Sequence, residues 1–540
     1  MFDASFESTQ TESVTPPPIP PKSFRLSANL LFLIPILFGL AYVGWSVHHD
    51  AGAMGEPLAM GAFLFLGLAL LIAFGFEFVN GFHDTANAVA TVIYTHSMPP
   101  LFAVIWSGVF NFLGVLASTG AVAYGIVMLL PVELILQVGT GAGYAMIFAL
   151  LISAIIWNLG TWMLGIPNSS SHALIGSIMG VGIANQLMSA AVNATSGIDW
   201  TQAAKVGKAL IFSPLVGFIA AALLLLAMKT LIRNPKLYEA PKDKAPPPFW
   251  IRATLIAACT GVSFAHGGND GQKGMGLIMI ILIGVAPATY ALNRSLPDAS
   301  QPAYITSLNA GEQAFAAEAH GATVPTLDIA RSAVNAAVRA RTIDTPDLHG
   351  ALAMMTGNIE YQIEAHGALR NVPAADMPQL RNDMYLVNGA ISILNNAKAA
   401  RPESETKALA GLQSTLNSMT RYIPDWVKVA TALALGLGTM VGWRRIVVTV
   451  GEKIGNSKMT YGQGAAAGLV AAVTIFAAER FGLPVSTTHI LSGGVAGTMT
   501  ANRSGLQWST IRGIALAWVL TLPATIVLAG ALYFIFRQFL

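Results

Sequence analysis

Long apolar runs recur along the whole chain, and they restrict what it can fold into. A helix needs about 20 mostly apolar residues to cross a bilayer. Of the 540 residues, 54% are hydrophobic and only 11% are charged, whereas soluble domains carry about 25% charged residues. A polytopic helical membrane protein is therefore predicted. The runs are Leu30–Val47, Leu58–Val79, Leu101–Leu130, Ala145–Leu164, Val206–Ile232, Ile251–Ala265, Gly276–Leu292, Val427–Trp443, Gly464–Ala478 and Ile511–Phe536.

Charge and cysteine content exclude several other classes. The formal net charge of +3 is small and scattered, so no nucleic-acid partner is expected. The single cysteine, Cys259, lies in an apolar run and supports neither a disulfide framework nor a thiolate metal site. A proline cluster at 16–21 predicts a disordered tail. We interpret Leu30–Val47 as an uncleaved first helix rather than a signal peptide.

Basic residues suggest the orientation of the chain. Lys and Arg gather in 229–252 and again in 444–458, and such segments mark the cytoplasmic side of a membrane protein. Between them, 294–425 is polar and rich in alanine, with helical periodicity. We expect this segment to be a soluble helical domain on the periplasmic side.

The chain also repeats itself. The sequence pattern of Gly165–Gly176 recurs in Gly482–Gly493. Each copy has a proline, then three consecutive residues that are serine or threonine, and then a histidine. We call these the tip motifs. Gly75–Asp84 resembles Gly261–Asp270, and these are the aspartate motifs. The aspartate motifs are 186 residues apart and the tip motifs 317 apart. The difference of 131 is close to the length of 294–425, so that segment is interpreted as an insertion into the second repeat.

Two such halves are common in transporters, whose binding sites lie between the repeats near the bilayer midplane. Both motif types interrupt apolar runs, and irregular backbone at membrane depth must be buried or line a wet cavity. We interpret the tip motifs as re-entrant hairpins and the aspartate motifs as breaks in discontinuous helices; ordinary aqueous loops are the alternative. The predicted fold is all-α, with two inverted-topology repeats and about 10–12 membrane segments.

The predicted domain organisation follows from these boundaries. It comprises a disordered N-terminal tail (1–26), an extra N-terminal helix and loop (27–57), a first membrane repeat (58–233), a basic cytoplasmic linker (234–250), the start of a second membrane repeat (251–293), the inserted soluble helical domain (294–425) and the rest of the second repeat (426–540).

The tip motifs carry hydroxyl groups immediately after a proline, where a helix can begin. A helix N-terminus offers free N–H groups and partial positive charge, which suit an anion. Two such tips would surround a tetrahedral oxyanion with neutral donors. The alternative is that the hydroxyls only cap their helices. The candidate oxyanion-binding residues are Ser169, Ser170, Ser171, Ser486, Thr487 and Thr488.

The aspartate motifs carry oxygen ligands for a cation. Asp84 and Asp270 occupy equivalent positions beside Asn87, Asn269 and Gln272. Carboxylates inside a membrane are costly and mark ion or proton paths, and carboxylate and amide oxygens suit hard cations. A cation or proton on each aspartate would offset the charge of an entering anion. The alternative is two structural N-caps.

Further charged and titratable residues accompany these motifs. Glu77 is interpreted as a coupling or structural carboxylate. Lys273 is either a counter-charge for the anion or an ion-paired lysine. The histidines either relay protons or are packed and hydrogen-bonded; they are His83, His172, His266 and His489.

At these residues a family resemblance emerges. Asn80–Asn87, Ala265–Gly274 and the two tips resemble the signatures of the inorganic phosphate transporter (PiT) family. The resemblance covers about 58–290 and 427–536. With His83 and the insertion, the chain is similar to the bacterial low-affinity phosphate permease branch.

That resemblance implies phosphate uptake, often as a neutral complex with Mg²⁺ or another divalent metal, driven by protons; other members use Na⁺. It implies that the tip hydroxyls and Gln272 bind phosphate. It assigns the coupling cation to Asp84, Asn87, Asn269 and Asp270, where we add His83 and Glu77. His83 replaces the Asn of many members, which favours protons. No catalytic role, resident cofactor or fixed metal site is expected. The expected location is the bacterial inner membrane, and homo-oligomers are left open.

Other functions remain open at this point. A membrane-embedded phosphatase also uses serine-rich tips, but phosphoryl transfer needs cationic stabilisation, and the tips contain no Lys or Arg. Hydroxyl and amide donors do not separate phosphate from sulfate or arsenate. A passive channel would use the same residues without accumulating the anion.

Overall fold

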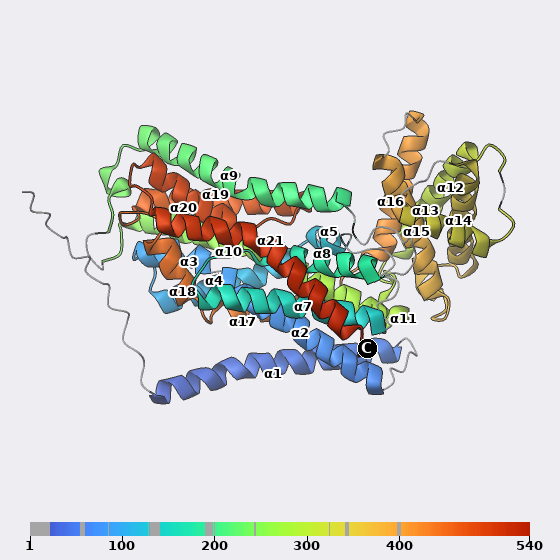
Figure 1. Ribbon diagram of the computed structural model, residues 1–540, viewed down its shortest axis with the longest axis horizontal. Coiled ribbons are helices and arrows are strands. Elements are labelled where there is room, and N and C mark those ends of the chain that lie inside the picture. The colour runs from blue at the N-terminus through green and yellow to red at the C-terminus, as the bar shows by residue number, and fades with distance from the viewer. Residues whose placement is uncertain are drawn as a thin grey trace, which may run out of the picture.

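The computed structural model describes residues 22–53, 60–84, 86–127, 129, 141–188, 198, 200–241, 245–322, 324–340, 345–396 and 401–540. Its regular elements within these residues are helices (Figure 1). The membrane-type helices are α1 (Lys22–Ala53), α2 (Met60–Asp84), α3 (Ala86–Tyr94), α4 (Pro100–Ala117), α5 (Ala121–Val127), α7 (Gly141–Met163), α8 (Ser170–Met188), α9 (Trp200–Leu231), α10 (Phe249–Val285), α11 (Pro287–Tyr290), α17 (Asp425–Thr439), α18 (Arg444–Glu452), α19 (Tyr461–Arg480), α20 (Thr487–Ala501) and α21 (Trp508–Phe536).

The chain is a multi-pass membrane protein by the length and apolarity of its helices. Six described helices can cross a membrane: Met60–Tyr94, which contains α2 and α3, and α4, α7, Ala203–Leu231 of α9, α19 and α21. The pair α17 and α18, bent by 64°, makes a seventh if counted as one span. This is fewer than the predicted 10–12 segments. The predicted runs Ile251–Ala265 and Gly276–Leu292 fall largely in one helix, α10, and neither α10 nor α1 is among the six.

The second aspartate motif lies inside a continuous helix. The sequence predicts two spans, Ile251–Ala265 and Gly276–Leu292, with a break between them, but α10 runs unbroken from Phe249 to Val285. The prediction of a discontinuous helix is therefore wrong here. The glycines of the motif bring helices together instead: a Cβ on Gly267 would lie 2.1 Å from the carbonyl oxygen of Asn111 on α4. Small residues allow such close approach in membranes.

Helices from distant parts of the sequence pack in matching pairs. α8 packs on α21 and α20 packs on α9 (Figure 1). A Cβ on Gly180 would lie 2.2 Å from Ile526 O, and one on Gly497 would lie 2.1 Å from Phe218 O. The two glycines occupy the same position of the repeat. Similarly, α10 packs on α4 and α2 packs on α17, so both halves of the sequence contribute to each pair.

The inserted segment forms a bundle of its own at one end of the molecule (Figure 1). Its helices are α12 (Gln301–Glu318), α13 (Leu327–Ala340), α14 (Pro346–Ala365), α15 (Met377–Asn396) and α16 (Glu403–Thr420). They share a hydrophobic core that includes Phe315, Leu352, Val387 and Leu412. The described residues also include three short 3₁₀ helices: η1 (Pro235–Tyr238), η2 (Asp298–Ser300) and η3 (Leu369–Asn371).

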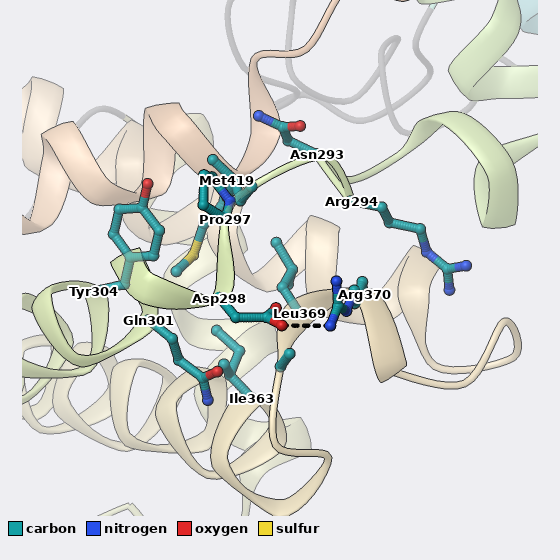
Figure 2. A pocket seen from close by; sticks show the side chains of 12 residues that line it. Asn293, Arg294, Pro297, Asp298, Gln301, Tyr304, Ile363, Leu369, Arg370 and Met419 are labelled. Atoms are coloured by element: carbon teal, nitrogen blue, oxygen red, sulfur yellow. Dashed lines mark hydrogen bonds and ion pairs between the residues drawn. The ribbon is translucent and has the colours of Figure 1, made fainter.

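A pocket lies where this bundle joins the membrane part, lined by Arg294, Asp298, Tyr304 and Arg370 among others (Figure 2). Its charged groups already have protein partners. Arg370 forms an ion pair with Asp298, and Arg294 Nη2 donates to Val372 O at 3.0 Å. These bonds hold the bundle against the segment that follows α11. The pocket contains none of the motif residues.

Candidate functional site

Each tip motif begins a helix, as the sequence predicts. α8 begins at Ser170 and α20 at Thr487. Ser169 Oγ accepts the backbone N–H of His172 at 3.2 Å, and Ser486 Oγ accepts that of His489 at 3.2 Å. The first hydroxyl of each tip is therefore an N-cap, which satisfies one of the free N–H groups of its helix.

The second hydroxyl of each tip does not cap its helix. Ser170 and Thr487 are equivalent in the repeat, and their side chains are 1% and 4% exposed. Neither hydroxyl oxygen has a hydrogen-bond partner within the described part of the chain. Buried polar groups are nearly always hydrogen-bonded, so two unpartnered hydroxyls at helix N-termini are available to a bound anion.

The third hydroxyl of each tip reaches the aspartate motif of the opposite half. Thr488 Oγ1 donates to Asp84 Oδ1 at 2.9 Å. Ser171 Oγ donates to Val485 O at 3.0 Å and accepts a hydrogen bond from Lys273 Nζ, which also donates to Asp270 Oδ1 at 2.7 Å. The tips and the aspartate motifs therefore form one connected cluster.

The two aspartates converge although they are 186 residues apart in sequence. Asp84 and Asp270 are 3% and 0% exposed. One side-chain ligand atom from each, together with one from His266, lies within 4.8 Å of the others. Two carboxylates and an imidazole at this separation can share a cation. The structure thus brings together the two residues that sequence reasoning placed at the coupling ion.

Two histidines contact these carboxylates. His83 Nδ1 lies 2.9 Å from Asp84 Oδ1, and its Nε2 lies 3.3 Å from Thr161 Oγ1. His266 Nε2 lies 3.6 Å from Asp270 Oδ2. His83 thus has a partner at each ring nitrogen. His266 bonds Asn111 Oδ1 through Nδ1 at 2.8 Å, whereas its Nε2 has no hydrogen-bond partner among the described residues. One histidine therefore lies beside each aspartate, His83 beside Asp84 and His266 beside Asp270.

The tip histidines meet each other instead. The rings of His172 and His489 have centroids 4.6 Å apart, and His489 also lies 4.1 Å from the Trp518 ring. His172 Nδ1 bonds Ser169 Oγ at 2.8 Å. The four histidines therefore form two groups, one at the carboxylates and one where the tips touch. A relay between these groups stays a prediction.

Two amide side chains, Asn269 in the second aspartate motif and Gln272 just after it, bond different neighbours. Gln272 Oε1 accepts the backbone N–H of Val122 at 2.9 Å, and its Nε2 donates to Gly268 O at 2.6 Å. These bonds connect α10 to α5 and to its own preceding turn. Asn269 Nδ2 donates to Leu483 O at 3.1 Å, beside the second tip, while its Oδ1 has no hydrogen-bond partner among the described residues. The side chain of Asn87 lies outside the described residues.

Glu77 lies beneath this cluster against α10. It is fully buried, and a Cβ on Gly274 would lie 2.2 Å from Glu77 Oε1. Neither carboxylate oxygen has a hydrogen-bond partner within the described ranges. Burying a carboxylate is costly, so Glu77 is a further acidic group that the fold retains against α10. Its coupling role stays a prediction.

Some site residues are missing from the sequence prediction. Asn111 on α4 bonds His266 Nδ1 through its Oδ1 at 2.8 Å, and its Nδ2 donates to Thr439 Oγ1 at 3.0 Å. The backbone carbonyl of Val485 accepts from Lys273 at 3.3 Å. Asn111 is an amide in the middle of an otherwise apolar run, and that is a signal the sequence offers. A backbone carbonyl leaves no such signal.

Known proteins resemble this chain over most of its length. Residues 80–529 match the family described as "Phosphate transporter family". The low-affinity inorganic phosphate transporter PitA of Escherichia coli is 42% identical over 507 residues, which cover 89% of this chain and 99% of PitA. PitB of the same organism is 40% identical, with coverage of 89% and 99%.

More distant proteins are similar over nearly the same length. A probable low-affinity inorganic phosphate transporter of Bacillus subtilis is 28% identical and covers 87% of this chain and 97% of its own. A solved structure, "The sodium-dependent phosphate transporter", is 19% identical with a TM-score of 0.49, covering 88% of this chain and 100% of that one.

Proposed function

The chain belongs to the phosphate transporter family, and on this premise we propose that it imports inorganic phosphate across the bacterial inner membrane by symport with a cation, protons being the expected coupling ion. It is a transporter, not an enzyme. The observation that carries the mechanism is the meeting of two hydroxyl-bearing helix N-termini with two buried carboxylates.

Phosphate is proposed to bind between the tips. The unpartnered hydroxyls of Ser170 and Thr487 lie at the N-termini of α8 and α20, where N–H groups and helix dipoles favour an anion. The remaining tip hydroxyls hold these two in place, by capping or by bonds to the opposite half. Neutral donors let the transporter release its substrate again. Gln272 is a proposed ligand that would have to exchange its present bonds to reach phosphate.

The coupling ion is proposed to bind at the aspartate motifs. A negative substrate entering a buried site next to Asp84 and Asp270 would meet like charge, of which Lys273 compensates that of Asp270. A cation or proton at these carboxylates offsets that repulsion, which is strong in a low-dielectric interior. Asn87, Asn269, His83 and Glu77 are the proposed helpers. Phosphate entering as a complex with Mg²⁺ or another divalent metal would bring part of the compensating charge with it.

The finer architecture is proposed to be two inverted repeats with re-entrant hairpins. The paired packing of α8 on α21 and α20 on α9 supports this arrangement, as do the equivalent close contacts at Gly180 and Gly497. The substrate would then lie between the halves, where relative movement opens it to either side. We propose the domain boundaries of the sequence prediction, except that the first helix begins at Lys22 rather than after residue 26. The inserted bundle is proposed to lie in the periplasm and 234–250 in the cytoplasm.

Uptake of labelled phosphate into proteoliposomes tests this function. A proton gradient and a Na⁺ gradient are imposed separately, each with and without Mg²⁺, and sulfate and arsenate are added as competitors. Accumulation driven by the proton gradient is the expected result. Accumulation that requires Na⁺ would keep the transporter and replace the coupling ion. Equilibration without accumulation would indicate a channel and contradict symport.

A further inference from the structure

The two aspartate motifs differ in what stands between the carboxylate and the facing tip. Asp84 and Asp270 are equivalent in the repeat, and so are Thr488 and Ser171. In the first half-site, Thr488 Oγ1 donates directly to Asp84 Oδ1 at 2.9 Å. In the second half-site, Asp270 and Ser171 do not bond each other in this way; both are bonded to the ammonium group of Lys273.

Oxygen atoms surround that ammonium as they would a small cation. Lys273 Nζ lies 2.7 Å from Asp270 Oδ1 and 3.3 Å from Val485 O, and it also donates to Ser171 Oγ. A carboxylate, a carbonyl and a hydroxyl from three separate segments are typical ligands of hard cations. Lys273 is only 1% exposed, so its charge is compensated here by the protein alone.

The same contacts weigh against a direct role in holding phosphate. A lysine ammonium has three N–H donors, and its three acceptors here are all protein oxygens. A substrate could reach Nζ only by displacing one of them. Removing a partner from a buried charge is costly, so the ammonium is held where it is.

We propose that Lys273 is the resident cation of the Asp270 half-site and closes this half-site to a free monovalent cation such as Na⁺. The first motif carries Asn87 at the equivalent position, three residues after its aspartate. A neutral amide cannot compensate the carboxylate in the same way. At this position the two half-sites differ in formal charge, and Lys273 leaves coupling to the Asp84 half-site. This rests on the proposed function only in taking the aspartates as the cation sites.

The test is to count the Na⁺ ions that the protein binds. Radioactive Na⁺ is equilibrated with the purified full-length protein in detergent, without phosphate. The count is compared between the wild type, Lys273→Asn, which copies the first motif, and the double variant Lys273→Asn with Asp270→Asn. We expect Lys273→Asn to bind one more Na⁺ per chain than the wild type, and the double variant to lose that ion again. This comparison holds whatever number the wild type binds.

Thermal unfolding gives an independent readout. Ligands that bind only the folded state raise its stability, so Na⁺ in place of choline at equal ionic strength should raise the Tm of Lys273→Asn more than that of the wild type. Lys273→Gln, which keeps more of the side-chain length, is a second variant for which the same changes are expected. The proposal is wrong if neither variant gains a Na⁺, if the gain persists without Asp270, or if neither folds in Na⁺.

Phosphate uptake and the Na⁺ count together distinguish failure of the proposed function from failure of the Lys273 proposal. If the wild type accumulates no phosphate in proteoliposomes while Lys273→Asn gains one Na⁺, the transport proposal is wrong and the cation assignment holds. If uptake is normal and the Na⁺ count does not change, only the role of Lys273 is wrong.

Discussion

The membrane part and the inserted bundle both bury charged side chains, but they satisfy them differently. In the bundle, Asp383 is 0% exposed and each of its oxygens accepts from Arg331, at 2.9 and 2.8 Å. In the membrane part, Asp84 bonds His83 and Thr488 and Asp270 bonds Lys273, while Asp270 Oδ2 and the tip hydroxyls of Ser170 and Thr487 have no hydrogen-bond partner among the described residues. The first arrangement fixes one conformation. The second holds unsatisfied groups that a ligand can complete, which is how a transport site differs from a structural ion pair.

Removing a carboxylate in the membrane part is expected to have the largest effect on transport. Asp84→Asn keeps the shape and a bond to Thr488 but removes the charge that we propose binds the coupling ion. We expect the rate of gradient-driven phosphate uptake to fall by roughly 100-fold, equivalent to about 3 kcal/mol. Uptake is measured in proteoliposomes at matched protein content. Near-normal uptake by a folded variant would remove Asp84 from the coupling site.

Removing the unpartnered hydroxyls should weaken phosphate binding. Hydrogen bonds to a charged group contribute about 1.5–3 kcal/mol each, so Ser170→Ala and Thr487→Ala should each raise the KM for phosphate roughly 10-fold. Ser392→Ala in the inserted bundle, whose hydroxyl donates to Asn388 O at 3.0 Å, is the control. An unchanged KM in both tip variants would show that these hydroxyls do not contact the substrate.

Close helix packing differs between positions within the membrane part. A Cβ on Gly438 would lie 2.1 Å from Phe78 O, whereas one on Gly160 has no atom within 4 Å. We expect Gly438→Ala to lower the stability of the membrane part by about 1–3 kcal/mol, seen as a lower Tm in detergent. Gly160→Ala should leave the Tm unchanged or slightly higher. Equal Tm values for both would mean that α2 and α17 do not approach this closely.

Breaking the ion pair in the bundle should affect stability and spare transport. Asp383→Asn removes charge-assisted bonds to Arg331 and should destabilise the bundle by about 2 kcal/mol. Faster proteolysis of this segment in the full-length protein measures the change. Asp328→Asn is the matched control: it contacts the same Arg331 at 3.0 Å, but its side chain is 90% exposed, and exposed pairs contribute about 0–1 kcal/mol. Loss of phosphate uptake in Asp383→Asn would show that the bundle takes part in transport.

The sequence by itself determined the class and family of this protein. Ten apolar runs and few charges predict a multi-pass membrane protein, and the repeated motifs predict membership of the phosphate transporter family; the described helices and the family match confirm both. It also predicts that a helix begins at each tip, because proline followed by hydroxyl residues is a local signal. These conclusions depend on composition and on short-range patterns, both of which can be identified directly in the sequence.

Only the tertiary structure decided how the motifs meet. The glycines around His266–Asp270 suggest a break, yet α10 is continuous, because a glycine read along the chain does not reveal the neighbouring helix that needs its space. Likewise, Lys273 leaves two interpretations open in the sequence. The choice follows from Ser171 and Val485, more than 100 and 200 residues away. Which oxygens surround a buried charge is a long-range property, and local pattern does not encode it.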